Sequence, residues 1–230
     1  MNSIIIMVIK IVIAVIAGVL AGHSVVYLFN RLPAEWLCDY GEEPSEELKH
    51  PTMQRIKGYP WKLTLSGMFI CIAIHLVIFD WQYCTAAMVY SWSLAMIFAA
   101  EKKYGIVPDQ FVLLTAASAI GFIPFFDSFM EHIYGMAAGA GVMLLSALLG
   151  KLLFKKETLG FGDVKLFAAI GLATGLKGTV SILVMSSLAA AAAFSVQMIR
   201  KKIKSDDMMP LGPYFCGAGI FYVVIICPLL

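Results

Sequence analysis

Long apolar stretches separated by short polar segments run along the whole chain. Eight can be marked, and each is near the roughly 20 residues that an α-helix needs to cross the hydrocarbon layer of a membrane. They cover residues 4–29, 62–80, 83–100, 107–126, 133–154, 162–176, 179–199 and 212–229. The sixth is short and rich in glycine, as in a partly re-entrant helix. The pattern predicts an all-α fold, a polytopic integral membrane helical bundle of about eight transmembrane helices.

Composition supports a membrane protein, because 60% of the 230 residues are hydrophobic and only 14% are charged. A soluble domain uses far more charge. The first stretch lacks the basic leader and small-residue end of a cleavable signal peptide, so we expect a retained helix. No boundary divides the chain, which predicts one integral membrane domain over 1–230 with a short cytoplasmic loop at 30–61. The lipid bilayer is its expected environment.

Charge predicts the orientation, because Lys and Arg accumulate in short cytoplasmic loops. Fourteen basic residues lie in alternate connections, at 30–62, 101–106, 151–161 and 200–211, whereas the other connections together hold one, Lys177. Both termini are therefore expected outside. Glu101, at the end of the third stretch, and Asp163, at the start of the sixth, are then predicted at one depth on the cytoplasmic side.

Two carboxylates held close together cannot both ionise easily, so they share a proton. The ionised group can activate water while the protonated group polarises a peptide carbonyl, which is the chemistry of aspartic proteases. This chemistry needs no metal and no cofactor, and we expect neither. His23, His50, His75 and His132 are scattered, and the five cysteines form no C-x-x-C pair. Two simpler interpretations stay open: Asp163 as a helix N-cap and Glu101 as a solvated helix end.

The loop at 30–61 contains an acidic cluster, which consists of Glu35, Asp39, Glu42, Glu43, Glu46 and Glu47. The simpler interpretation is a solvated loop. The more specific interpretation is that the cluster attracts a basic peptide, because clustered charge of one sign steers an oppositely charged partner. No basic and aromatic cluster suggests a nucleic-acid partner, and nothing in the sequence specifies an oligomeric state.

Four segments, in order, resemble those of the type IV prepilin peptidases, a family of bacterial membrane aspartic proteases. Gly160-Phe161-Gly162-Asp163-Val164-Lys165-Leu166 is similar to their G-x-G-D-x-K-L motif. The other three are Asn30-Arg31-Leu32-Pro33, Ile106-Val107-Pro108-Asp109 and Pro210-Leu211-Gly212-Pro213-Tyr214. The G-x-G-D motif alone is shared with presenilin-like proteases, so the order of all four carries the resemblance.

The resemblance implies cleavage of the short basic leader of prepilin or pseudopilin-like proteins at the cytoplasmic membrane face. Asp163 takes the place of one catalytic aspartate. The other lies seven residues before the proline of the Pro-Asp segment, and counting back from Pro108 gives Glu101, so a glutamate stands there. Many members also bind zinc with two C-x-x-C pairs and methylate the new pilin terminus. Only Cys38 stands in the corresponding loop, so zinc and methylation are not carried over.

The remaining motif residues have candidate roles around this pair. Gly160 and Gly162 would let an extended substrate backbone lie alongside. Lys165 either reaches the lipid headgroups or tunes a nearby carboxylate, with the first interpretation favoured.

Asp109 is a rival partner for Asp163 or, as favoured, a polar residue that starts a helix beside Pro108. Pro210 and Gly212 belong to the segment before the last helix.

The sequence thus favours a membrane aspartic endopeptidase with Glu101 and Asp163 as its catalytic pair. A second hypothesis is a family member with impaired catalysis that acts as a membrane assembly or binding protein, which the glutamate supports. A small proton-coupled transporter is the third, and the lack of related halves in the sequence disfavours it.

Overall fold

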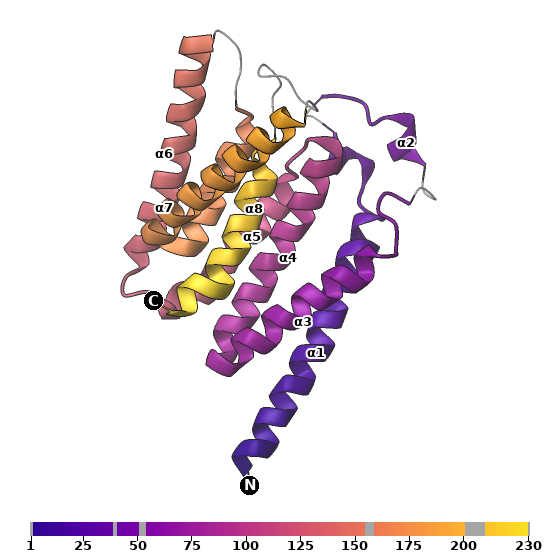
Figure 1. Cartoon of the computed structure of the whole chain (residues 1–230), viewed down its shortest axis with the longest axis vertical. Helices are drawn as coiled ribbons and strands as arrows, with labels where there is room; N and C mark the ends of the chain where they lie inside the picture. The colour runs from indigo at the N-terminus through magenta and orange to yellow at the C-terminus, as the bar shows by residue number, and fades with distance from the viewer. Residues whose placement is uncertain (1, 39–40, 51–53, 155–158, 201–209, 230) are drawn as a thin grey trace.

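A computed structural model describes residues 2–38, 41–50, 54–154, 159–200 and 210–229 (Figure 1). Within these ranges every regular element is a helix, so the predicted all-α class is confirmed. The longer helices are α1 (Asn2–Phe29), α3 (Trp61–Phe79), α4 (Trp81–Tyr104), α5 (Asp109–Phe122), α6 (Phe129–Phe154), α7 (Phe161–Ile199) and α8 (Gly212–Phe221). Shorter helical turns are η1 (Ala34–Leu37), α2 (Glu46–Lys49), η2 (Ile123–Phe125), η3 (Tyr222–Ile226) and η4 (Cys227–Leu229).

The expected count of eight membrane-spanning helices is not confirmed. In the described ranges six helices are long and apolar enough to cross a membrane, and α5 with η2 forms a shorter apolar helix. One of the two missing spans is this shorter helix, predicted at 107–126. The other arises in α7, whose 39 residues contain both of the predicted segments at 162–176 and 179–199. The chain is a multi-pass membrane protein by the length and composition of these helices.

A sharp bend divides α7 at Gly175, whose φ of 68° and ψ of −178° are not helical. This backbone conformation is essentially restricted to glycine. A Cβ atom added to Gly171 would lie 2.9 Å from Thr179 Oγ1, whereas eight residues of a straight helix span about 12 Å. The chain therefore folds back on itself, and Figure 1 shows the two arms of α7 beside α6.

Helix α4 lies at the centre of the bundle and packs against α3, α5 and α8. Its buried face contains Tyr90, Leu94 and Ile97, whose side chains are inaccessible to solvent. These positions are spaced four and three residues apart, which places them on one side of a helix. Glu101 follows Ile97 by four residues and so continues the same buried stripe, one turn before the helix ends.

The loop at 30–61 is fastened to the end of α1 and to α4. The Asn30 side chain exchanges two hydrogen bonds with the backbone of Ile56, at 2.8 and 3.0 Å. Arg55 donates to the Leu32 carbonyl at 2.6 Å, and Lys103 in the last turn of α4 donates to the Arg55 carbonyl. These bonds hold the loop over the end of α4 that carries Glu101.

The connection that precedes α5 and the first turn of α7 lie at the same end of the bundle as α2, toward the top of Figure 1. The N-terminal end of α1 and the last turn, η4, lie at the opposite end. This arrangement is consistent with the prediction that the basic connections share one side of the membrane. Which end of the bundle faces the cytoplasm stays a prediction. Several residues used for it lie outside the described ranges: Lys155, Lys156, Lys201, Lys202 and Lys204. Asp39 of the acidic cluster also lies outside them.

Candidate active site

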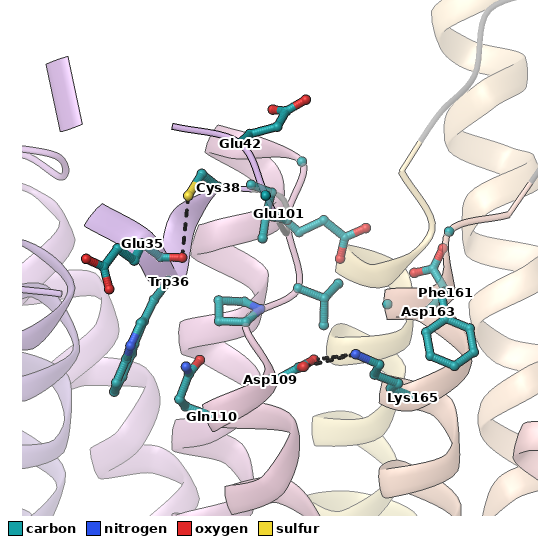
Figure 2. Close-up of a pocket in the computed structure, with 17 residues that line it drawn as sticks. Glu35, Trp36, Cys38, Glu42, Glu101, Asp109, Gln110, Phe161, Asp163 and Lys165 are labelled. Carbon is teal, nitrogen blue, oxygen red and sulfur yellow. Dashed lines mark hydrogen bonds and ion pairs between the residues drawn. The ribbon is translucent and has the colours of Figure 1, made fainter. Parts of the chain in front are cut away.

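A cavity of about 800 Å³ opens at the end of the bundle that carries Glu101. Three parts of the chain line it, namely the first part of the loop at 30–61, the connection between α4 and α5, and the start of α7. Both predicted catalytic residues, Glu101 and Asp163, are among its lining residues. Figure 2 shows their carboxyl groups extending toward one another from two sides of the cavity.

Glu101 is only 6% exposed, so the interpretation as a solvated helix end is wrong. One carboxyl oxygen, Oε1, accepts a hydrogen bond from the backbone N–H of Gly212 at 3.0 Å. The other, Oε2, is buried and has no hydrogen-bond partner among the described residues. A buried carboxyl oxygen without a partner is costly and uncommon in folded proteins, so this atom is a candidate to contact water or substrate in the cavity.

Asp163 is the third residue of α7, and Gly160 takes the N-cap position. The interpretation of Asp163 as the N-cap is therefore wrong. Its Oδ1 atom is buried and has no hydrogen-bond partner in the ranges that the structure covers. Leu166, Phe167 and Ile170, which follow at helical spacing, are fully buried, so Asp163 also extends an apolar stripe into the cavity.

The two carboxyl groups are electrostatically coupled, since the charge of Asp163 acts on Glu101. Each carboxyl group lies near the N-terminus of a helix: Asp163 belongs to the first turn of α7, and Glu101, from the last turn of α4, accepts a hydrogen bond from the first N–H of α8. Helix N-termini carry partial positive charge and stabilise nearby carboxylates. This explains how two acids are accommodated at an otherwise apolar helix junction.

Lys165 forms an ion pair with Asp109, and its Nζ lies 3.0 and 2.9 Å from the two carboxyl oxygens. Both side chains are about one third exposed. The favoured interpretation of Lys165 as a side chain that reaches the headgroups is therefore wrong. The carboxylate that Lys165 contacts is Asp109, and a tuning role for this contact stays a prediction. Asp109 begins α5 and Pro108 is its N-cap residue, as predicted.

The glycines of the motif differ in their surroundings. A Cβ atom on Gly162 would lie 3.1 Å from Val107 Cβ, whereas nothing lies within 4 Å of one on Gly160. Gly162 thus packs against the connection between α4 and α5, and open space for another chain exists only beside Gly160. Both glycines line the cavity with Lys165, Pro108 and Asp109. Pro210 is exposed and Gly212 touches Glu101, and neither lines the cavity.

The rim of the cavity includes residues whose position the sequence did not predict. Glu35, Trp36 and Glu42 of the loop at 30–61 line it, and Figure 2 shows them on the side of Glu101. Trp36 packs edge-on against Phe111 of α5, which brings the acidic segment over the cavity. The acidic cluster was visible in the sequence, but its distance from Asp163 was not.

No group of three or more potential metal ligands occurs among the described residues.

The fold and the site indicate the class of protein: a helical membrane protein with two carboxyl groups in one cavity at the end of its bundle. Residues 88–195, which contain both carboxyl groups, match the type IV leader peptidase family. Over this segment the chain belongs to that family, and the resemblance to the prepilin peptidases is confirmed.

Three relatives carry the description prepilin leader peptidase/N-methyltransferase. The protein of Xanthomonas campestris is 30% identical over 165 residues, which are 70% of this chain and 56% of that protein. The protein of Stutzerimonas stutzeri is 29% identical over 143 residues, covering 61% and 49%. That of Aeromonas hydrophila is 27% identical over 163 residues, covering 70% and 56%. The chain thus spans about half the length of the curated relatives it matches, and no solved structure matches it.

Proposed function

We propose that the protein is a membrane-embedded aspartic endopeptidase that cleaves the basic leader of prepilin or pseudopilin-like proteins. The observation that carries the proposal is the pair of Glu101 and Asp163 in one cavity, each with a buried oxygen that has no partner within the described chain. Membership of the matched segment in a leader peptidase family supports the same reaction.

The reaction uses the two carboxyl groups as a unit that holds one proton. The ionised carboxylate takes a proton from a water molecule, whose oxygen attacks the carbon of the scissile peptide bond. The protonated partner donates its proton to the carbonyl oxygen, which gives a tetrahedral diol. As the diol collapses, one of its O–H groups gives its proton to the ionised carboxylate. The C–N bond breaks, and the protonated carboxyl group gives its proton to the leaving amine, so the pair again holds one proton.

The substrate is proposed to enter from the membrane with its apolar helix beside the bundle and its basic leader at the cavity rim. Glu35 and Glu42 supply negative charge at this rim. The nearby Glu43 and Glu46 lie within 3.5 and 3.4 Å of Lys49, which partly neutralises them. With the basic connections in the cytoplasm, cleavage takes place at the cytoplasmic face of the bacterial inner membrane.

A cleavage assay with a prepilin substrate in detergent or proteoliposomes tests the proposal. We expect Asp163→Asn and Glu101→Gln each to lower kcat by roughly 10²–10⁴-fold, because each removes one proton-transferring group while keeping its shape. Asp127→Asn is the matched control, since Asp127 is an exposed acid outside the cavity. Cleavage that persists unchanged in Asp163→Asn would overturn the proposal.

A second candidate is a catalytically impaired family member that serves as a membrane assembly or binding protein. The glutamate at position 101 favours it, because the longer side chain moves the carboxyl group by roughly 1–1.5 Å, and such a displacement can cost about 10²-fold in rate. The variant Glu101→Asp separates the two functions. An inactive parent protein that gains cleavage in this variant supports impairment, whereas an active parent protein supports the peptidase.

A further inference from the structure

The longer side chain of Glu101 ends directly against the backbone of Gly212. Besides the hydrogen bond from the Gly212 N–H, the carboxyl group covers the face of Gly212 where other residues carry their Cβ. A Cβ atom there would overlap Glu101 Oε2 and lie 2.7 Å from Oε1. Gly212 is also buried, so the carboxyl group cannot simply swing into solvent. The contact requires glycine at this position.

The first turn of α8 offers a single N–H group to this carboxyl. Pro213, next to Gly212, has no N–H. The N–H groups of Tyr214 and Phe215 both point back to the Leu211 carbonyl, at 2.9 and 3.1 Å. The donor of Gly212 is therefore the one that remains for Glu101, at the positive end of the helix. It binds Oε1, while Oε2 packs against the face of Gly212 that lacks a Cβ and has no hydrogen-bond partner among the described residues.

We infer that Gly212 is the positioning residue for Glu101: its N–H and its missing Cβ fix the carboxyl group at the wall of the cavity for its reaction with Asp163. The inference rests on the proposed peptidase function and goes beyond it, because it assigns to α8 a part in the site. It also gives the glutamate a structural partner. The extra methylene moves the carboxyl group away from α4 and onto the α8 terminus, where an aspartate would fall short by roughly 1–1.5 Å.

A double-mutant cycle between positions 101 and 212 tests the inference. The variants are Gly212→Ala, Glu101→Asp and their combination, with kcat and KM measured for prepilin cleavage. The melting temperature in detergent is measured without substrate. Gly217→Ala is the matched control, because Gly217 lies in the same helix, is exposed, and has no atom within 4 Å of an added Cβ.

We expect Gly212→Ala to lower kcat by about 10²-fold with little change in KM, as displacement of a reacting group does. It should also lower the melting temperature by at least about 3 °C. Both changes should shrink in the Glu101→Asp background, where the shorter side chain leaves room for the new methyl group. Gly217→Ala should keep both values. Equal losses from Gly212→Ala in the two backgrounds, or none in either, would overturn the inference.

The two readouts also separate this inference from the proposed function. If the parent protein cleaves no prepilin, the peptidase proposal fails, and the melting temperatures alone decide whether Gly212 holds Glu101. If the parent protein is active but the two substitutions act independently, the peptidase proposal stands and the role of Gly212 is rejected.

Discussion

At the scale of single residues, the sequence predicted the two acids of the site but not what holds them. Glu101 and Asp163 followed from motif spacing and from the placement of charged loops, and both also continue stripes of buried residues at helical spacing. Lys165 and Asp109 are 56 positions apart. Their pairing depends on how α7 packs on α5, which no local pattern encodes. The contact between Gly212 and Glu101 was hidden for the same reason.

The ion pair between Lys165 and Asp109 gives a prediction at this scale. Either single change, Lys165→Met or Asp109→Asn, leaves a half-buried charge without the opposite charge that faced it at 2.9 Å. We expect each to lower the free energy of unfolding by about 1 kcal/mol. The double variant should lose less than the sum of the two. Thermal or denaturant unfolding in detergent measures all three.

The control is Lys49→Met, which removes an exposed ion pair with Glu46 and should change the free energy of unfolding by less than about 0.5 kcal/mol. Strictly additive effects of Lys165→Met and Asp109→Asn would show that the two side chains do not interact in solution.

At the scale of elements, hydrophobic periodicity predicted where helices occur but not how they are joined. The apolar segments at 162–176 and 179–199 read as two spans, and the structure joins them through one residue with an unusual backbone conformation. Gly175 is one of several glycines in this stretch, and the sequence does not reveal which of them has a positive φ. Phe126 packs against this position, since its ring would lie 2.7 Å from a Cβ atom on Gly175.

Gly175→Ala tests the importance of this bend. The substitution forces an alanine into a backbone region that is essentially restricted to glycine, which costs about 1–3 kcal/mol, and places its methyl group against Phe126. We expect a lower melting temperature and a loss of cleavage, because this bend ends the arm of α7 that carries Asp163. Melting and prepilin cleavage are measured in the same detergent preparation.

Gly141→Ala in α6 is the matched control, since no atom lies within 4 Å of an added Cβ there. Alanine favours a helix by up to about 1 kcal/mol over glycine, so this variant should keep or raise the melting temperature. A Gly175→Ala protein as stable as Gly141→Ala would contradict the bend.

At the scale of the whole molecule, charge bias predicted which connections share one end of the bundle. The structure does bring the connection before α5 and the start of α7 together with the first part of the loop at 30–61 (Figure 1). The hydrogen bonds that hold this loop in place come from the side chains of Arg55, Asn30 and Lys103. They were not predictable, because they use backbone carbonyls that any sequence provides. As a result, an acidic segment that looked merely solvated lies over the proposed catalytic pair.

The orientation follows from the same charge bias and is open to a direct test. Single cysteines are introduced as Glu43→Cys and Asp127→Cys, which are exposed positions at the two ends of the bundle. A membrane-impermeant maleimide added to intact cells should label Asp127→Cys at once, but Glu43→Cys only after permeabilisation. The unsubstituted protein provides the background from its native cysteines. The opposite labelling pattern would place the proposed site outside the cytoplasm.

The acidic rim leads to a prediction about substrate choice. Glu35 and Glu42 are among the residues at the cavity rim, and the structure gives neither of them an ion pair within the described ranges. Each exposed charge contributes up to about 1 kcal/mol to attraction of an opposite charge. Reversing both, as in Glu35→Lys with Glu42→Lys, should therefore raise KM for a basic-leader substrate by roughly 10-fold or more. We expect kcat to stay close to its parent value, because neither residue takes part in proton transfer.

Two comparisons make the test specific to the rim. Glu43→Lys reverses a charge of the same loop that already faces Lys49, and it should raise KM less than either rim substitution does. A substrate whose leader carries acidic residues in place of the basic ones should be cleaved better by the double reversal than by the parent protein. The advantage should weaken as salt is added, because exposed charges are screened within about 10 Å at 0.1 M ionic strength. If the double reversal instead lowers kcat for both substrates alike, the rim shapes the catalytic pair and does not select the leader.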